Sequence, residues 1–249
     1  MYVSSCGEPT PDAKAIESDT VSGAAQLETP RPPYKTIPVA NGGSITGTVE
    51  LLRDVVFDTS VQLAKGSDGC GTGKIRIPLI NLSGRRVAEV IVWLDDARVG
   101  KPLPDTRRFT IASALCGFQP RVQAAIAGGM LNVISTDPIE HRTRFMSASN
   151  GKTIETILQH DAGAVVPVET VLRRVGRVLV RSDLHPWMQG WIQVFDHPYF
   201  VVTGSSGDFQ IDNVPAGRYR LVAWHPKLGQ RDTTVSVSSS ATTDLKLRY

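Results

Sequence analysis

Short runs of alternating apolar and polar residues, separated by turn residues, fill the chain from Gly43 onward. In the first run, residues 43–51, every second position from Ile45 to Leu51 is apolar or glycine, and Thr or Glu stands between. Because successive side chains of a strand point to opposite faces, this pattern predicts a strand with one buried face. Comparable runs follow at residues 75–80, 87–94, 130–134, 177–181, 190–195, 199–203, 209–211, 218–224, 233–237 and 245–247. Strands this short and frequent, with no sustained period of 3.6, favour β-sandwiches.

Two segments are compatible with a short helix. One is residues 152–160 and the other is residues 168–174, where Pro167 stands at a position suited to the first turn. We expect a short helix at one or the other of these segments, in a chain that is otherwise all β.

The first 42 residues have a different character and are interpreted as an arm. Residues 6–41 are rich in Pro, Ser, Thr, Ala and Glu and have no periodic apolar pattern. We expect either a tether of about 35 residues or an arm laid along a partner. Cys6 follows two serines, as in the cleavage box of a bacterial lipoprotein, and the alternative is an unpaired thiol. Lipidation there would supply two or more acyl chains, enough for stable membrane attachment.

Composition narrows the class of partner. The chain has 249 residues, of which 41% are hydrophobic and 20% charged, and its formal net charge is +3. That is ordinary for a soluble globular protein and gives no basic surface of the kind that binds a phosphate backbone, so nucleic acid is not expected as a partner. No stretch approaches the roughly 20 apolar residues that cross a bilayer.

Cys70 and Cys116 lie within the patterned region, each beside glycine. They lack the close spacing of a zinc knuckle or a redox pair, so a disulfide is the simplest interpretation. Two separate buried thiols, packed as small hydrophobic groups, remain the alternative.

The last fifty residues contain two turns around a hairpin. Asp208-Phe209 follows one turn, and the second turn is the run Val214-Pro215-Ala216-Gly217-Arg218-Tyr219. This pattern resembles the carboxypeptidase regulatory-like domain, a small transthyretin-like sandwich. The resemblance implies such a domain at residues 196–249 and does not by itself imply an activity.

A sharper resemblance lies just before it. The run Ser182-Asp183-Leu184-His185-Pro186-Trp187-Met188 leads into a strand and then into Asp196-His197-Pro198-Tyr199-Phe200. It resembles the copper loop of a bacterial plastocyanin-like family, whose members read Cys-Asp-x-His-Pro-Trp-Met and continue into Asp-His-Pro-Tyr-Phe. Upstream, the segments at residues 116–120 and 135–141 match the family's disulfide cysteine and first ligand histidine. The resemblance implies a cupredoxin-like Greek-key sandwich, placed at residues 43–195. It leaves open which sandwich the strand at residues 43–51 joins.

Carried over residue by residue, the family's copper ligands fall on His141, His185 and Met188, with Ser182 in the place of the thiolate. Blue copper needs two imidazoles, a thiolate and a long axial thioether, and a neutral serine hydroxyl cannot replace the soft anionic sulfur. We therefore expect no copper cofactor. On this interpretation the histidines serve only as hydrogen-bonding neutral rings that shape the loop. The alternative is a weak copper site formed by the two histidines and Met188.

The remaining histidines give no sign of catalysis. His160 is expected to be exposed, His197 to make a structural hydrogen bond in a turn, and His225 to stand at a strand end. No Gly-x-Ser-x-Gly elbow is present, and Ser182 is too close in sequence to its neighbouring Asp183 and His185 to build an oriented triad. We expect a protein that is not an enzyme.

Aromatic residues gather around the copper-like loop: Trp187, Trp191, Tyr199 and Phe200. In working cupredoxins an apolar rim around the exposed ligand histidine is the docking face, so these residues are predicted to dock a partner; the alternative is that most of them are core. The resulting hypothesis is a non-enzymatic docking subunit, periplasmic and lipid-anchored, on a membrane electron-transfer complex of respiratory or photosynthetic type. The alternatives are a copper carrier or atypical cupredoxin using His141, His185 and Met188, and a free periplasmic adhesion or carbohydrate-binding module.

Overall fold

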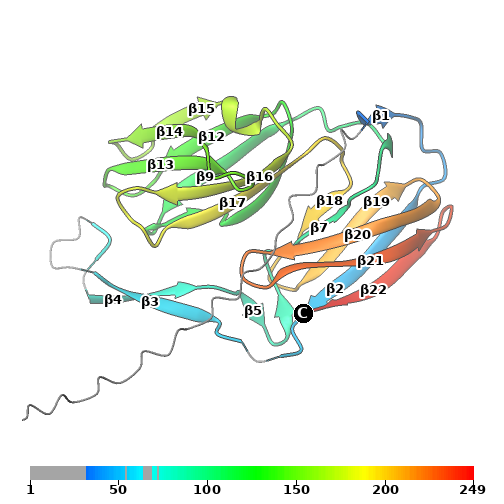
Figure 1. The fold of residues 1–249 in the computed structure, drawn as a ribbon, viewed down its shortest axis with the longest axis horizontal. Helices are drawn as coiled ribbons and strands as arrows, with labels where there is room; N and C mark the ends of the chain where they lie inside the picture. The colour runs from blue at the N-terminus through cyan, green and yellow to red at the C-terminus, as the bar shows by residue number, and fades with distance from the viewer. Residues whose placement is uncertain (1–31, 54, 64–68, 72) are drawn as a thin grey trace, which may run out of the picture. The chain divides into compact units, whose positions relative to one another are not determined.

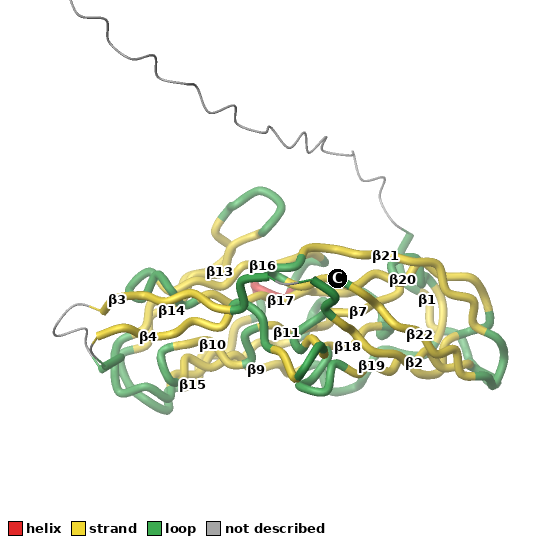
Figure 2. Tube along the Cα trace, turned by 90° about the horizontal axis from the view of Figure 1, so that it is seen from below, coloured by secondary structure: helices red, strands yellow, loops and turns green. Residues whose placement is uncertain are grey.

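The computed structural model describes residues 32–249 except 54, 64–68 and 72. Strands account for nearly all of the regular structure in these residues, and a single turn of 3-10 helix at Thr170–Leu172 is the exception (Figure 2). The expectation of an almost entirely β chain built from sandwiches is confirmed. None of the described residues forms a helix long and apolar enough to cross a membrane.

Two sheets form the first sandwich (Figure 1). One has the order β10 (Gly117–Gln119), β9 (Arg108–Ala114), β12 (Met130–Ser135) and β15 (Val165–Val168). The other has the order β11 (Val122–Ile126), β17 (Gln189–Phe195), β16 (Gly176–Ser182), β13 (His141–Ser147) and β14 (Thr153–Gln159). Their facing side chains, among them Leu131, Phe145 and Ile192, make one buried apolar core.

Two more sheets form the second sandwich. One has the order β18 (Phe200–Val202), β7 (Ile91–Leu94), β20 (Gly217–His225) and β21 (Gly229–Val237). The other has the order β19 (Asp208–Val214), β2 (Gly43–Glu50), β6 (Arg86–Val87) and β5 (Leu82–Ser83), and β22 (Thr242–Arg248) also pairs with β2. The core between them includes Ile45, Leu94, Tyr199 and Leu221.

The boundary predicted at residue 43 is wrong for this division into sheets. Strand β2 pairs antiparallel with β19 and parallel with β22, and β7 pairs with β18 and β20, so residues 43–50 and 91–94 belong to the second sandwich. The first sandwich is therefore inserted into the second one. Alternation shows that one face of a strand is buried, but it does not identify the neighbouring strand, which is why the pattern left this point open.

Gly47 shows how tightly β2 fits in its sheet. A Cβ atom at this position would stand 2.2 Å from the carbonyl oxygen of Leu245 on β22 and 2.7 Å from the ring of Phe209 on β19. Glycine is needed here because the neighbouring backbone and ring occupy the space that a side chain would take.

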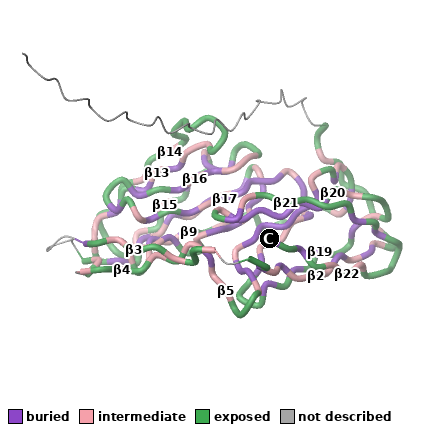
Figure 3. The backbone as a smooth tube through the Cα atoms, turned by 60° about the horizontal axis from the view of Figure 1, so that its bottom comes forward, coloured by how far each residue is buried: buried purple, intermediate pink, exposed green. Residues whose placement is uncertain are grey.

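Pro33–Tyr249 forms one compact unit, and a third apolar cluster joins its two sandwiches. Strand β7 is buried throughout because its alternate residues serve two cores: Val92 and Leu94 lie in the second sandwich, and Ile91 and Trp93 lie in the joining cluster. Strands β17 and β20 start with exposed residues, and their later, buried residues likewise divide between a sandwich core and the joining cluster. Most of β17 is coloured as buried in Figure 3. Arg177 of β16 adds a cation–π contact, with its guanidinium carbon 3.7 Å from the ring centroid of Trp224.

A separate hairpin of β3 (Asp58–Leu63) and β4 (Gly73–Pro78) belongs to neither sandwich. The predicted disulfide is present: Cys70, beyond the described end of β3, is bonded to Cys116 at the turn between β9 and β10, across a sequence separation of 46. A further short pair, β1 (Lys35–Thr36) with β8 (Val99–Gly100), is parallel.

The helix expected at residues 152–160 is wrong, because this segment is strand β14, paired with β13. Its side chains alternate between exposed and less exposed positions, as in a strand with one covered face. At residues 168–174 the structure has only the 3-10 turn. In β14, tertiary pairing overrides local propensity.

Candidate functional site

The loop Ser182–Met188 closes on itself through its own backbone. The Ser182 N–H donates to the Met188 carbonyl oxygen (3.3 Å), and the Met188 N–H donates to the His185 carbonyl oxygen (2.9 Å). The Ser182 hydroxyl is buried and accepts a hydrogen bond from the His185 N–H at 3.0 Å. The serine therefore acts as a turn-forming acceptor for the residue three positions on.

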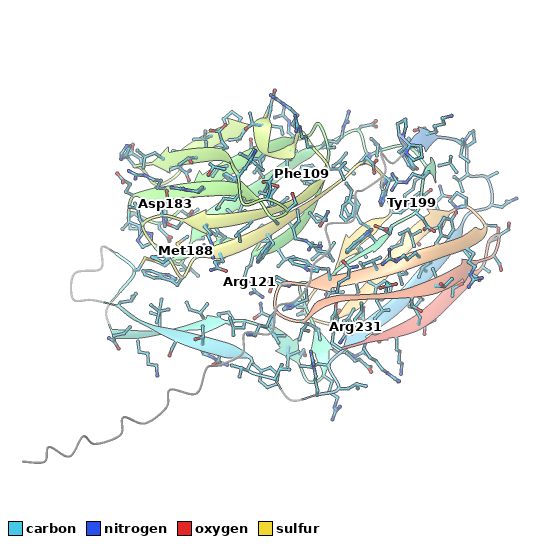
Figure 4. The ribbon with its side chains drawn as sticks, viewed as in Figure 1. Phe109, Arg121, Asp183, Met188, Tyr199 and Arg231 are labelled. Atoms are coloured by element: carbon cyan, nitrogen blue, oxygen red, sulfur yellow. A yellow bond between two sulfur atoms is a disulfide. The ribbon has the colours of Figure 1, made fainter. Side chains whose placement is uncertain are left out.

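The structure brings the two matched histidines together. His141, at the start of β13, is completely buried, and its ring centroid lies 5.1 Å from that of His185. The ring of Trp187 lies edge-on to His185 at 5.2 Å. Met188 is buried in the core of the first sandwich, at the end of that sandwich shown in Figure 4. The expected cluster of His141, Ser182, His185 and Met188 is thus one local region of the fold.

Asp137 orients this region, and the sequence analysis missed it. Its carboxylate accepts three hydrogen bonds, from the Leu115 N–H (2.7 Å), the Cys116 N–H (3.0 Å) and Nε2 of His141 (3.1 Å). With Nε2 as donor, Nδ1 of His141 carries the lone pair, and Nδ1 has no hydrogen-bond partner among the described residues. The only signal in the sequence was the spacing of four residues between Asp137 and His141.

These residues do not fit a blue-copper centre. Such a centre needs a thiolate in the plane of its two imidazoles, and Ser182 offers a hydroxyl that already accepts from His185 N–H. Cys70 and Cys116 are bonded to each other. The described residues contain no group of three or more His, Cys, Asp and Glu side chains placed to hold a metal ion. An imidazole nitrogen and a thioether do remain as donors that suit cuprous copper.

The other histidines take structural places. Nδ1 of His197 accepts from the Tyr199 N–H at 3.2 Å, which confirms the structural hydrogen bond expected in this turn. His160 is exposed, as expected, with Nδ1 2.7 Å from a Glu140 carboxylate oxygen. His225 ends β20, and its Nδ1 accepts from the N–H groups of Lys227 and Leu228. Burial, reinforced by the nearby Arg121 guanidinium, lowers the pKa of His225 to about 3.

The predicted docking set is divided by burial, because Tyr199 is fully buried and cannot dock a partner, whereas Trp191 and Phe200 are half-buried. Tyr199 is 0% exposed in the core of the second sandwich, where its hydroxyl accepts from the Lys101 N–H. Trp191 and Phe200 pack against the cluster that joins the sandwiches. Only Trp187 lies at the copper-like loop, where its Nε1–H donates to the Cys116 carbonyl oxygen at 3.2 Å. Large aromatic side chains pack between the two sandwiches because their burial stabilises that interface.

Two exposed leucines that the sequence did not point to lie at the same loop, one within it and one on a neighbouring turn. Leu115, at the β9–β10 turn, is 89% exposed, and Leu184, within the loop, is 41% exposed. Leu115 and Cys116 both have positive φ, +52° and +56°, a region that costs non-glycine residues energy. The Asp137 carboxylate holds this strained turn by accepting both of its N–H groups.

A groove of about 280 Å³ runs beside the loop. The hairpin contributes Val61, Ile77 and Pro78 to its lining, and the first sandwich contributes Trp187, Trp191 and Arg121. Arg121 is itself neutralised by Glu89, to which its Nε–H donates at 2.9 Å. The groove thus lies between the hairpin and the end of the first sandwich that carries the loop Ser182–Met188.

Cys6, with the lipidation predicted for it, and the arm up to residue 31 lie outside the described residues. The arm's last residues are described: Tyr34 donates its hydroxyl to the Lys101 carbonyl oxygen at 2.6 Å, and burial raises its pKa.

Comparisons with known proteins give partial matches. A family model described as polysaccharide lyase family 4, domain II, matches residues 178–245, which include strands of both sandwiches. No curated relative matches the chain.

Among solved structures, the chain is similar to a copper-containing nitrite reductase from Thermus scotoductus SA-01, at 18% identity and a TM-score of 0.30. This match covers 41% of the present chain and 24% of the reductase. A purple cupredoxin from Nitrosopumilus maritimus matches at 18% identity and a TM-score of 0.29, over 35% of this chain and 99% of its own. An amicyanin from Paracoccus versutus matches at 16% identity and a TM-score of 0.30, over 37% of this chain and 85% of its own.

Proposed function

We propose that this protein is a non-enzymatic docking subunit built on a cupredoxin-like scaffold whose copper-binding thiolate is replaced by Ser182. Its docking surface, here called the loop face, consists of Leu115, Leu184 and Trp187. The class of partner, a periplasmic membrane complex of an electron-transfer chain, follows from the family resemblance of the loop.

The exposed Leu115 carries the proposal. Strained backbone persists only where the surrounding structure holds it, and here Asp137 holds a two-residue turn whose tip is an almost fully exposed leucine. An apolar side chain that stays in water on a strained turn does not stabilise the folded monomer. It gains free energy when a partner covers it, roughly 1.5–3 kcal/mol for a fully buried leucine.

Site-specific photocrosslinking from position 115 tests the proposal. The full-length protein, carrying a photoreactive phenylalanine in place of Leu115, is mixed with membranes of the organism that produces it and irradiated. We expect crosslinks to a subunit of a membrane electron-transfer complex. Crosslinks from position 115 to no membrane protein at all would exclude the loop face as the docking surface.

Charged variants give the matched measurement. L115D with L184D removes both leucines of the loop face, so we expect membrane binding to fall at least tenfold, since about 1.4 kcal/mol corresponds to a factor of ten. V175D is the control, because Val175 is also exposed, at 55%, but lies between Leu172 and β16, outside the loop face. Equal binding by the two variants would refute the assignment of the surface.

A second candidate function is copper carriage, and Nδ1 of His141, which has no hydrogen-bond partner among the described residues, favours it. This nitrogen is buried, its ring is oriented by a carboxylate on Nε2, and that arrangement is typical of histidines that bind metals. His141, His185 and Met188 would hold cuprous copper through imidazole nitrogen and thioether sulfur.

Metal analysis separates the two candidates. Copper carriage predicts one copper per chain after purification with cuprous copper and a much weaker affinity in H141A. The docking proposal predicts membrane binding that is the same with and without added copper. Stoichiometric copper that is required for membrane binding would replace the first proposal with the second.

A further inference from the structure

The outer face of the five-stranded sheet in the first sandwich has a covered half and an open half. Arg177 of β16 lies on this face, because it alternates with the core residue Val178. Its guanidinium stacks on Trp224, so the second sandwich covers that half of the face. The other half lies at the end of the sheet next to the loop Ser182–Met188, and its charged residues are exposed or half-buried.

Three arginines project from the open half. On β13, Arg142 and Arg144 alternate with buried residues, and on β16 Arg181 stands between two buried residues. Arg144 is directly opposite Arg181 in the pairing of these strands. Arg142 and Arg181 are exposed, and the Arg144 side chain is 41% exposed. The three side chains, here called the arginine face, therefore lie on one open surface.

The arginine face has an excess of positive charge. The Asp183 carboxylate accepts from Nη2 of Arg144 at 2.7 Å (Figure 4). Neither Arg142 nor Arg181 forms an ion pair or a side-chain hydrogen bond with a described residue. Glu140, just before β13, contacts the exposed imidazole that follows β14. Two of the three guanidiniums are thus available to an anion from outside the chain.

The opposition of Arg144 and Arg181 does not stabilise the folded monomer. Like charges directly opposite each other on neighbouring strands are destabilising. Nε of Arg144 is also buried and has no hydrogen-bond partner among the described residues. Carboxylates placed over these side chains replace the repulsion with charge-assisted hydrogen bonds, which are stronger than neutral ones.

The arginine face adjoins the loop face. The Asp183 N–H donates to the Arg142 carbonyl oxygen at 2.9 Å, and Leu184 of the loop face is the next residue. Leu158 of β14, which is 42% exposed, stands opposite Arg142. A partner that covers Leu184 is therefore brought close to the guanidiniums as well.

We propose that the arginine face binds carboxylates on an acidic surface of the docking partner; this inference rests on the proposed docking function. A guanidinium matches a carboxylate with two parallel N–H···O bonds, which an ammonium group cannot form, and all three cations here are arginines. Such charge pairs speed the encounter of two proteins and fix their orientation. Membrane surfaces are bound through clusters of about 4–8 basic residues, more than this face carries, so the chemistry favours a protein over anionic lipid.

An NMR titration of the purified full-length protein with a peptide of about ten glutamates tests the inference without the partner. We expect the largest shifts at the arginine Nε–H groups and backbone amides of β13 and β16, and their loss in about 0.5 M salt. R142Q/R181Q is expected to weaken peptide binding about tenfold. R218Q/R248Q is the matched control, because it removes two exposed arginines of the second sandwich with the same change in net charge, and it should bind like the wild type.

Thermal unfolding shows whether the test variant is folded. R142Q/R181Q should melt no lower than the wild type, because it removes the like-charged pair across β13 and β16. Two results of the titration would overturn the arginine face. Equal weakening in both double variants would mean that only net charge matters. Binding to vesicles of phosphatidylcholine and phosphatidylglycerol, but not to the glutamate peptide, would assign the face to lipid.

Membrane binding separates this inference from the docking proposal. On membranes of the producing organism, R142Q/R181Q is expected to bind about tenfold more weakly than R218Q/R248Q. If R142Q/R181Q bound like the wild type while L115D with L184D did not, docking would stand and the acidic partner would be refuted. If L115D with L184D bound normally and R142Q/R181Q did not, the loop face would be refuted and the arginine face would be the contact.

Discussion

Asp137→Asn is the substitution that most directly tests how the candidate site is held together. Asp137 presents two acceptor oxygens to three donors: Oδ1 accepts from Leu115 N–H, and Oδ2 accepts from Cys116 N–H and from His141 Nε2. An asparagine of the same shape keeps one oxygen and turns an NH₂ group toward at least one of these donors. The variant therefore loses one hydrogen bond to a charged group and weakens the other two.

The expected cost follows from those bonds. A hydrogen bond to a charged group contributes roughly 1.5–3 kcal/mol, so we expect D137N to lower the free energy of unfolding of the first sandwich by about 2–3 kcal/mol. Urea unfolding of the disulfide-intact protein, followed by tryptophan fluorescence, measures this value. Trp187 lies in the affected region, because its Nε1–H donates to Cys116.

Asp183→Asn is the matched control. Asp183 also pairs with a cation, at 2.7 Å from Nη2 of Arg144, but this ion pair lies at the surface. We expect its loss to cost about 0–1 kcal/mol. If D137N were no more destabilising than D183N, the three hydrogen bonds would not be what holds the turn at Leu115, and the argument for the loop face would fail with them.

Three further predictions concern the joined sandwiches. Because the pKa of His225 is about 3 in the folded protein and near 6.5 when unfolded, its contribution to stability is complete above pH 6.5 and is lost as the pH falls toward 3. In H225N, the amide oxygen replaces the Nδ1 acceptor and does not titrate. Between pH 6 and 4.5 the free energy of unfolding of the wild type should therefore fall by up to roughly 1.4 kcal/mol per pH unit more than that of H225N. Parallel pH profiles of the two proteins would contradict this. R177Q removes the guanidinium from the face of Trp224 and should lower the free energy of unfolding by about 1–2 kcal/mol with a change in near-ultraviolet circular dichroism; an unchanged spectrum would argue against the contact. G47A should cost more than about 2 kcal/mol because its Cβ meets the Leu245 carbonyl oxygen, whereas G204A, with open space around it, should be nearly neutral, and similar melting temperatures for the two would refute the steric argument.

Local patterns predicted much of the fold and part of the candidate site. Period-two alternation located strands such as β2 and β20, and the run from Ser182 to Met188 identified the loop that the structure places beside His141. Both are short-range properties, since side-chain direction in a strand and hydrogen bonding within a turn depend on neighbouring residues. The sequence pattern did not predict strand β14, because pairing with β13, a non-local interaction, decides its conformation.

The burial of Tyr199, which had been predicted to dock a partner, has a related reason. Tyr199, Trp191 and Phe200 are close to the loop in sequence, yet the chain turns them into its own core and into the cluster between the sandwiches. Leu115 lies far from the loop in sequence and beside it in space, because Asp137 fixes its turn next to His141. Proximity along the chain therefore did not identify Leu115, an exposed apolar residue that lies near the loop only in space.

By itself, the sequence determined that the chain is all β, that Cys70 and Cys116 were available to pair, and that a serine stands where a copper site needs sulfur. Only the tertiary structure decided that one sandwich is inserted into the other, that Asp137 joins the Leu115 turn to His141, and that β3–β4 and the loop line one groove. The physical reason is that chemical identity and strand periodicity are local properties of the chain, whereas strand partners and buried contacts arise between segments that are distant in sequence.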